Sequence, residues 1–421
     1  MTRRWLEIIT AFLSILLLSL RRSALARAME SAPHLVIGVT HSQTCLLLRK
    51  RLRTLREAGF RVTLICSPGP LADQLAQREG IDFIPISMRR GIAPLHDLIA
   101  LLRLTLLLFR LHPDVTEFST PKAGLLGSIA AWIAAVPARV YMLRGLRLEA
   151  SRGGEERLLL RLEKLAAAAS HTVLCNSESL RAQALALGIA PAWKLEVLGR
   201  GSSNGVDTER FSPGPASLRA ELGLPASAPV VGFVGRLTYA KGVPDLLCAF
   251  DLLLQSEPQA HLLLVGWFDA AEDALSHAWR QRILKHPRIH VTGMVEDAAP
   301  YYRAMDLLVL PTWREGFPNA ALEAASTALP IITTQATGAC DSVEDGVTGI
   351  LLPPGYPAAL CDSILELLHD PRRRQQMGVA ARQRILQHYS EATVFANTVA
   401  FYHSLTAEAV TGRPIVPLPN S

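Results

Sequence analysis

Short apolar runs alternate with longer amphipathic segments along most of this chain. A short apolar run bounded by glycine, proline or polar residues is typical of a strand in a buried parallel sheet. In the first half such runs predict strands at 35–39, 62–66, 82–86, 114–118, 139–143, 172–175 and 195–198. In the second half they predict strands at 230–234, 261–265, 289–291, 307–310, 331–334 and 350–352. Helical segments lie between most of these runs, so each half is predicted to be an α/β domain with a doubly wound parallel sheet.

Two breaks in this pattern divide the chain, whose 421 residues are too many for one ordinary domain. Residues 199–207 (GRGSSNGVD) are rich in glycine and serine, and 213–215 (PGP) has the composition of a linker. We therefore expect an N-terminal domain over 30–208 and a C-terminal domain over 216–388. A last helix over 389–411 would follow and could cross back to the first domain, and 412–421 has the composition of a disordered tail.

The segment 1–28 stands apart from both domains. An apolar run over 5–20 lies between Arg3-Arg4 and Arg21-Arg22, and the sequence Ala-Leu-Ala at 24–26 resembles a signal-peptidase site. Sixteen residues are fewer than the roughly 20 that a spanning helix needs. Three interpretations stay open: an interfacial membrane anchor, a signal peptide, or a start codon assigned too early, with Met29 as the true start. Arginines on both sides favour the anchor.

Charge is unevenly distributed along the chain, although the net value is only +6. Residues 1–200 contain 27 Lys and Arg against 15 Asp and Glu, a balance of +12, whereas 201–421 contain 16 against 22, a balance of −6. A basic first half suits an anionic partner, whether nucleic acid, an acidic membrane surface or a phosphorylated acceptor. The alternative is that the arginines are scattered over the surface and bind no partner.

The six cysteines are dispersed, which indicates buried thiols in a reducing compartment and no zinc site.

The segment 96–111 is strongly apolar, and Arg103 and Arg110 lie seven residues apart on one face of the predicted helix. Such a helix could lie on a membrane with its arginines reaching the headgroups. The alternative, which we favour slightly, is a helix packed on the sheet.

The stretch 307–326 (LLVLPTWREGFPNAALEAAS) combines a buried strand, a turn and a helix. The turn carries Glu315, Gly316, Phe317 and Pro318, and Glu323 follows in the first turns of the helix. In open α/β sheets ligands bind beyond the carboxyl ends of strands, and helix N-termini attract phosphate. Backbone N–H groups for a diphosphate and two carboxylates for sugar hydroxyls indicate a nucleotide-sugar site, although two carboxylates could also serve as the acid and base of a glycosidase.

A second cluster follows the strand 230–234. Gly235 lets a ligand approach the backbone, Arg236 offers a bidentate fork for phosphate, and Lys241 offers a point charge. The P-loop pattern GxxxxGK[ST] is absent from the sequence. Gly293 and Met294 follow the strand 289–291, in a loop where a nucleobase could lie.

The first half also places polar residues directly after strands. Thr40 and His41 follow the strand 35–39, and Lys122, Arg144 and Arg147 lie in later loops of the same kind. Three cations on such loops would suit an acidic substrate, although solvation explains any one of them equally well.

These residues together resemble the retaining glycosyltransferase family 4. The matching motifs are Gly235-Arg236-Leu237 with Lys241-Gly242, the E-x7-E pattern of Glu315 and Glu323, and Asn204-Gly205-Val206-Asp207 at the joint. The resemblance implies the GT-B fold, with two Rossmann-like domains facing a cleft and the C-terminal helix crossing back to the first. It also implies that Arg236 and Lys241 bind the donor diphosphate, Glu323 the ribose and Glu315 the donor hexose, with the 316–318 backbone around sugar and phosphate. Retention of anomeric configuration, no metal and no cofactor are further implications.

The first half is similar to members that act in bacterial capsule, exopolysaccharide or O-antigen assembly, through 119–124 (STPKAG), 143–148 (LRGLRL) and 201–207 (GSSNGVD). Those members transfer a sugar, here expected from a UDP donor, to an undecaprenyl-diphosphate-linked acceptor on the cytoplasmic face of the membrane. We therefore expect these two substrates and an anionic membrane surface as partners, with no nucleic acid. Attachment would be peripheral or through the N-terminal segment.

One departure from the family concerns Arg144, because many members have a histidine there that contacts the donor sugar. Arg144 could instead bind an acidic sugar group or the acceptor phosphate. Two other functions stay open: a UDP-sugar epimerase of the same fold, which needs no acceptor, and an inactive membrane-bound scaffold. We expect a hexosyltransferase because Glu315 and Glu323 are both present.

Overall fold

The structure is a computed structural model that describes residues 32–89, 91, 93–150, 153–269 and 273–411. The predictions for 1–28 and 412–421 lie outside the described residues. Contacts divide the described chain into two compact units: 32–141 with 169–171 and 399–411, and 142–168 with 172–398. None of the helices within these ranges is long and apolar enough to cross a membrane.

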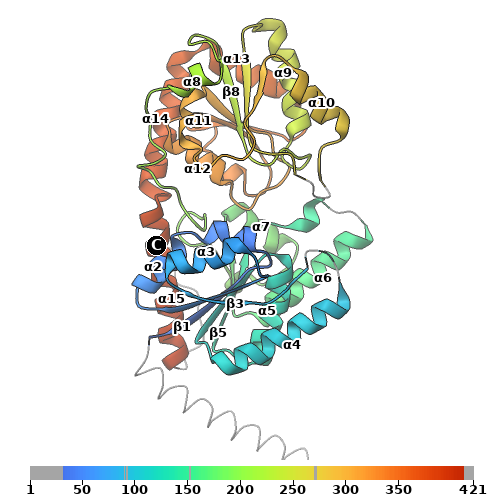
Figure 1. The fold of residues 1–421 in the computed structure, drawn as a ribbon, viewed down its shortest axis with the longest axis vertical. Helices are drawn as coiled ribbons and strands as arrows, with labels where there is room; N and C mark the ends of the chain where they lie inside the picture. The colour runs from blue at the N-terminus through green and yellow to red at the C-terminus, as the bar shows by residue number, and fades with distance from the viewer. Residues whose placement is uncertain (1–31, 90, 92, 151–152, 270–272, 412–421) are drawn as a thin grey trace, which may run out of the picture. The chain divides into compact units, whose positions relative to one another are not determined.

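Two parallel sheets form the frame of the fold (Figure 1). The first has the order β3-β2-β1-β4-β5-β6-β7 and the second the order β10-β9-β8-β11-β12-β13. The strands of the first sheet are β1 (His34–Gly38), β2 (Arg61–Cys66), β3 (Asp82–Pro85), β4 (Val115–Ser119), β5 (Ala138–Leu143), β6 (Thr172–Cys175) and β7 (Leu195–Glu196). Those of the second are β8 (Val230–Val234), β9 (His261–Val265), β10 (Ile289–Val291), β11 (Leu307–Leu310), β12 (Ile331–Thr334) and β13 (Gly349–Leu352). Every predicted strand is confirmed, within one residue at most ends.

Helices and 3-10 turns connect these strands. The first group is η1 (Ser42–Leu48), α2 (Arg51–Glu57), α3 (Pro70–Glu79), α4 (Pro94–Leu111), α5 (Pro121–Ile133), η2 (Arg147–Ala150), α6 (Gly154–Ala169), α7 (Glu178–Ala186) and η3 (Ala192–Lys194). The second group is α8 (Leu218–Glu221), α9 (Val243–Ser256), α10 (His277–Lys285), α11 (Ala299–Ala304), α12 (Asn319–Ser326), η4 (Cys340–Ser342), α13 (Pro357–His369), α14 (Pro371–His388) and α15 (Glu391–Thr411). Asp370 caps α14 as a helix-start residue should, its carboxylate accepting from the Arg373 backbone N–H at 2.9 Å.

Strand β4 shows how the first sheet is covered on both faces. Successive side chains of a strand point to opposite faces. Phe118 packs in a cluster with Leu104 of α4 and Leu126 of α5, whereas the neighbouring Glu117 pairs with Arg51 of α2. Helices α4 and α5 therefore cover one face and α2 covers the other. The interpretation of 96–111 as a helix packed on the sheet is confirmed for the side of α4 that meets this cluster.

The last helix returns to the first sheet, which confirms the predicted crossover. Tyr402 of α15 is fully buried, and its hydroxyl lies 3.2 Å from Nη2 of Arg51 and also donates to Glu117. Its ring meets Phe60 edge-on, with 6.3 Å between the ring centroids. The ion pair between Arg51 and Glu117 is removed from water and shares this hydroxyl, so α15 is held by a buried polar network as well as by apolar packing.

Candidate active site

The loops at the carboxyl edge of the second sheet meet closely. Gly266 adopts φ +157°, and a Cβ atom there would lie 1.8 Å from the carbonyl oxygen of Gly235. Gly266 also forms a bridge with Gly293, so the loops after β8, β9 and β10 are in contact. Only glycine permits this approach, because any side chain at Gly266 would overlap the neighbouring backbone. The three loops therefore meet backbone to backbone at the strand end that also carries Arg236.

Arg236 stands directly after β8 and pairs with Asp269. Its Nη1 lies 2.6 Å from Oδ2 of Asp269, in the loop that follows β9. The arginine is half-buried and the carboxylate more so, but enough of the arginine reaches water to weaken the attraction, and a stronger anion could replace Asp269. The sequence interpretation missed Asp269, although its place four residues after a strand end marks it as an edge residue.

Lys241 and Glu315 form an ion pair, which brings together two residues predicted to bind adjoining parts of the donor, the diphosphate and the hexose. Gly242 makes this possible: it adopts φ +68°, and a Cβ there would lie 1.8 Å from the carbonyl oxygen of Pro311. The Lys241 loop is thereby pressed against the end of β11, beside the turn that carries Glu315. Both side chains are mostly buried, so their charges are poorly screened.

Glu323 lies deeper, on α12, and accepts a hydrogen bond of 2.7 Å from the Tyr302 hydroxyl. Burial raises the pKa of Glu323 to about 7, while the Tyr302 hydrogen bond and the charge of Arg210 act in the opposite direction. Tyr302 is itself fully buried on α11, and its pKa is raised by burial and by the carboxylate. No sequence pattern pointed to Tyr302, because α11 has only six residues and no helix is predicted there.

The turn 315–318 is fixed by its backbone. The Glu315 N–H donates to the carbonyl of Thr337 at 3.0 Å, and a Cβ at Gly316 would lie 1.9 Å from the carbonyl oxygen of Arg144. Phe317 is buried against Tyr389. Pro318 precedes α12, and no side chain caps the first N–H groups of that helix. Those groups are available to an oxygen-rich ligand.

Exposed rings and a thioether lie on the same loops. Met294 follows β10 and is among the most exposed apolar side chains of the described structure, while Trp267 follows Gly266 directly and is exposed too. The flat ring of Trp267 and the flexible thioether of Met294 both suit the face of a nucleobase. Trp267 was not among the predicted residues; an aromatic residue directly after a strand-end glycine is the signal that could have identified it.

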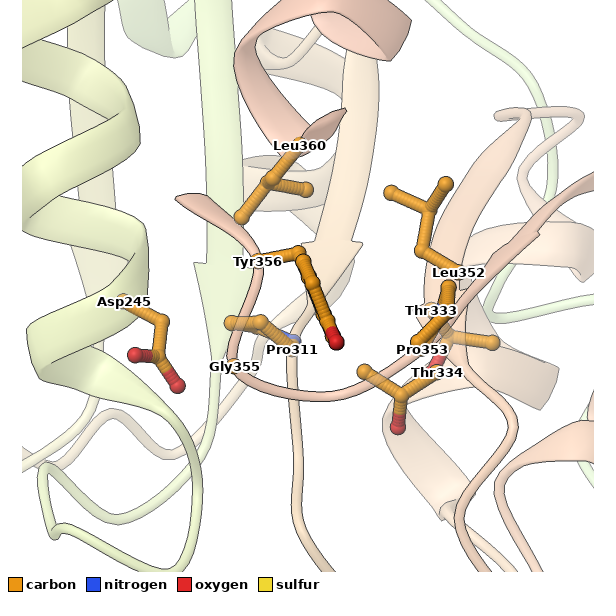
Figure 2. A pocket seen from close by; sticks show the side chains of 9 residues that line it. All are labelled: Asp245, Pro311, Thr333, Thr334, Leu352, Pro353, Gly355, Tyr356 and Leu360. Carbon is orange, nitrogen blue, oxygen red and sulfur yellow. The ribbon is translucent and has the colours of Figure 1, made fainter. Parts of the chain in front are cut away.

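A small cavity lies beyond the ends of β11, β12 and β13 (Figure 2). Asp245 and Tyr356 face into it, together with Thr334. Burial raises the pKa of Asp245, and the Trp313 ring N–H, which donates to it at 2.9 Å, lowers it. The cavity has room for about one water molecule, so it does not hold a sugar.

Arg144 belongs to the same compact unit as these loops, and its Nη1 donates to the Ser203 hydroxyl at 2.7 Å. Its carbonyl is the group that meets Gly316, so the Arg144 loop touches the turn that carries Glu315. The role of its guanidinium toward a sugar stays a prediction.

Nowhere in the described ranges do three His, Cys, Asp or Glu side chains converge as a metal site would require. Catalysis without a metal ion also stays a prediction.

The candidate residues of the first unit have structural partners. The Thr40 hydroxyl accepts from the Ala123 N–H at 3.1 Å and lies 2.6 Å from the Thr120 hydroxyl, at the start of α5. Lys122 pairs with Asp97 of α4. His41 accepts from the Gln43 N–H at 3.4 Å and lines an open hollow of about 520 Å³ with Ser67 and Arg89. Four residues are predicted to contact the acceptor or the donor sugar: Thr40, His41, Lys122 and Arg144. Of these, Thr40 and His41 lie near this hollow.

Comparisons with known proteins agree with this geometry. Residues 228–370 match the family model "Glycosyl transferases group 1", and residues 47–201 match "Glycosyl transferase 4-like domain". The chain is 32% identical over 372 residues to the capsular polysaccharide biosynthesis glycosyltransferase CapM of Staphylococcus aureus, covering 88% of this chain and 97% of that protein. It is 29% identical over 334 residues to the Escherichia coli enzyme UDP-Gal:alpha-D-GlcNAc-diphosphoundecaprenol alpha-1,3-galactosyltransferase, covering 76% and 84%.

The fold is also similar to solved structures. Anabaena HepE in complex with UDP superimposes with a TM-score of 0.73 at 22% identity, over 88% of this chain and all of that one. The predicted GT-B architecture is confirmed by this likeness and by the two parallel sheets. The match to CapM extends over nearly the whole of that relative, and both halves of the chain match glycosyltransferase models. The chain therefore belongs to glycosyltransferase family 4 and is a glycosyltransferase with the GT-B fold.

Proposed function

We propose that the protein transfers a hexose from a UDP-sugar to a lipid-diphosphate-linked sugar acceptor in the synthesis of a bacterial surface polysaccharide. The observation that carries this proposal is the Lys241–Glu315 pair beside Arg236 at the carboxyl edge of the second sheet. The names of the relatives support the substrate classes: CapM acts in capsular polysaccharide synthesis, and the E. coli enzyme takes UDP-Gal and a diphosphoundecaprenol acceptor. A HepE structure holds UDP-glucose.

The paired charges suggest how the donor binds. A diphosphate carries more negative charge than one carboxylate, so it would draw Arg236 from Asp269 and Lys241 from Glu315. Glu315, released from the lysine, could then accept hydrogen bonds from hexose hydroxyls. The donor would thus exchange two protein ion pairs for contacts to itself, and Glu323 would hold the ribose hydroxyls.

Retention of the anomeric configuration is part of the proposal. The bond between the sugar C1 and the diphosphate oxygen breaks, and its electron pair stays on the leaving UDP. The acceptor hydroxyl oxygen bonds to C1 on the same face, and its proton passes to an oxygen of the leaving diphosphate. Negative charge grows on that diphosphate, so preorganised cations and helix N–H groups supply the stabilisation without a metal ion.

The acceptor would bind in the first unit, where the hollow beside His41 and Arg89 lies at the carboxyl edge of its sheet. We place the reaction at the cytoplasmic face of the plasma membrane, as the family resemblance implies.

The test replaces each phosphate-binding cation. Arg236→Ala and Lys241→Ala should each lower kcat by about 10²–10³, because each removes one charge that stabilises the leaving diphosphate. Activity is measured as UDP release from a panel of UDP-, GDP- and ADP-sugars with a lipid-diphosphate acceptor, and the product anomer is identified by NMR. Incubation of the donor alone detects epimerisation.

Arg373→Ala is the matched control, since Arg373 is an equally exposed arginine that pairs with Glu366 on α13. It should leave turnover unchanged, and thermal unfolding should confirm that all three variants fold. Turnover near that of the unaltered protein in both Arg236→Ala and Lys241→Ala would contradict the proposal. So would an unaltered protein that binds the donor but transfers no sugar.

A further inference from the structure

Helix α4 (Pro94–Leu111) is apolar on two sides, and among the described residues only one of these sides is buried against protein. Its inner side buries Ala100, Leu104 and Leu108 against α5 and the first sheet. Its outer side carries six large apolar side chains whose exposed fractions lie between 43% and 69%. They are Leu95, Leu98, Ile99, Leu102, Leu106 and Phe109.

The outer residues form one straight stripe. At 3.6 residues per turn, their spacing places all six within an arc of about 100° on the helix, opposite the packed side. The rise per residue makes the stripe about 21 Å long from Leu95 to Phe109. A soluble monomer rarely exposes so many large apolar side chains together, and such a patch marks an interaction surface.

Helix α5 extends the surface at one end. Lys122 near its start pairs with Asp97 near the start of α4, so the two packed helices run in the same direction. Both helices have the same rise per residue. Trp132 and Ile133, which are exposed at the end of α5, therefore lie level with the end of α4. Two further exposed apolar side chains therefore lie on the neighbouring helix, level with the end of the α4 stripe.

The charges beside the stripe have one sign. Arg103 and Arg110 are exposed and lie on one flank of the stripe, within about a quarter turn of its centre. The one acidic residue of α4, Asp97, lies toward the packed side and is already paired with Lys122. A flat apolar stripe with arginines along one flank suits a surface that is apolar inside and anionic at its rim.

We propose that this outer face of α4, with the end of α5, docks on an anionic lipid bilayer. The six apolar side chains would enter the boundary between headgroups and acyl chains, and Arg103 and Arg110 would reach the lipid phosphates. A second copy of the chain fits less well. An isologous pairing would bring four arginines beside one apolar seam with no exposed acidic residue of α4 to neutralise them.

The first test measures binding of the full-length protein to phosphatidylcholine vesicles with and without phosphatidylglycerol, without donor or acceptor. Leu98→Gln/Leu102→Gln/Leu106→Gln should weaken binding to the anionic vesicles by about tenfold or more. Glutamine keeps helix propensity, and the exposed sites bear no core packing, so folding should be preserved. Arg103→Gln/Arg110→Gln should reduce the preference for anionic vesicles.

Leu284→Gln/Val379→Gln/Leu386→Gln is the matched control, because these side chains are similarly exposed on α10 and α14. Binding should not change in this variant. Equal losses in the control and the α4 variant would contradict the proposal, and vesicle binding is scored separately from transfer, so a failure here leaves the proposed reaction untouched.

A local probe identifies the docking face even if another segment also binds lipid. A fluorescent label at Leu102→Cys should be quenched by nitroxide lipids, while one at Glu57→Cys, on α2 across the sheet, should not; the unmodified chain gives the background from native thiols. A Leu102 label that stays in water while the protein sediments with vesicles overturns the proposal. So does a doubled solution mass with the label shielded before lipid is added, which would assign the face to a second copy.

Discussion

The carboxyl edges of the two sheets carry similar residue types but use them differently. At the second edge, Arg236 and Lys241 pair with carboxylates that also lie on edge loops. At the first edge, Lys122 joins the starts of α4 and α5, and the Thr40 hydroxyl accepts an N–H of α5. A ligand can replace a partner in the first kind of contact, whereas the second kind holds helices in place. Residue type after a strand end therefore does not by itself distinguish a binding residue from a structural one.

Buried charge extends this contrast into the interior of the first unit. Glu117 lies in the middle of β4, fully buried, and its partners Arg51 and Tyr402 come from α2 and α15. Nothing in this network reaches the surface, so it serves the fold.

The largest expected effect breaks this buried network. Glu117→Gln should lower the free energy of unfolding by about 3–5 kcal/mol, because Arg51 would remain buried without its counter-charge. Denaturant unfolding measures the loss. Tyr402→Phe removes only a hydroxyl and should cost about 1–2 kcal/mol. The variants that stay folded should bind UDP as the unaltered protein does; weakened UDP binding with intact folding would show that the first sheet shares in donor recognition.

The next prediction concerns the Lys241–Glu315 ion pair at the carboxyl edge of the second sheet. Lys241→Ala and Glu315→Ala should each reduce kcat/KM by about 10²–10³. The double variant should lose at least the product of the two, because the ion pair that the donor must open in the unaltered protein is already absent from each single variant. Thermal unfolding should change little in comparison with Glu117→Gln. A double variant that loses much less than the product would mean that the two residues stay paired and act on the donor as one unit.

The strands were predictable because each is a short buried apolar run, such as 307–310. Helix α10 escaped prediction because Ile283 is its one buried residue, so its sequence has no apolar stripe. Arg236, Lys241 and Glu315 were identifiable from their places after strand ends. Their pairings were not, since Lys241 and Glu315 are 74 residues apart and meet only because Gly242 lets one loop press on another. The outer stripe of α4 was visible as an apolar run, but its exposure depends on which side the sheet covers.

The smallest expected effect tests whether Glu323 binds the donor in its ionised form at the carboxyl edge of the second sheet. Burial raises the pKa of Glu323 to about 7, so near neutral pH the side chain is only partly ionised. If the ionised form accepts ribose hydroxyls, the affinity for UDP should rise as the pH increases through about 7. The same raised pKa means that the contribution of Glu323 to folding stability is greatest below its unfolded value and is lost as the pH rises through about 7.

Tyr302→Phe sharpens the assignment because its hydroxyl donates to the ionised carboxylate. Without that donor the pKa of Glu323 should rise further, so the pH midpoint for UDP binding should move upward and the affinity at pH 7 should fall several-fold. Isothermal titration across pH 6–9 measures the midpoint. Glu323→Gln should remove the part of the pH dependence that comes from the protein and leave the part from the terminal phosphate of UDP, which loses its second proton at a pH of about 6. A purely structural role for Tyr302 would weaken binding equally at every pH, whereas loss of a pKa-controlling donor weakens it near pH 7 and leaves it almost unchanged at pH 9.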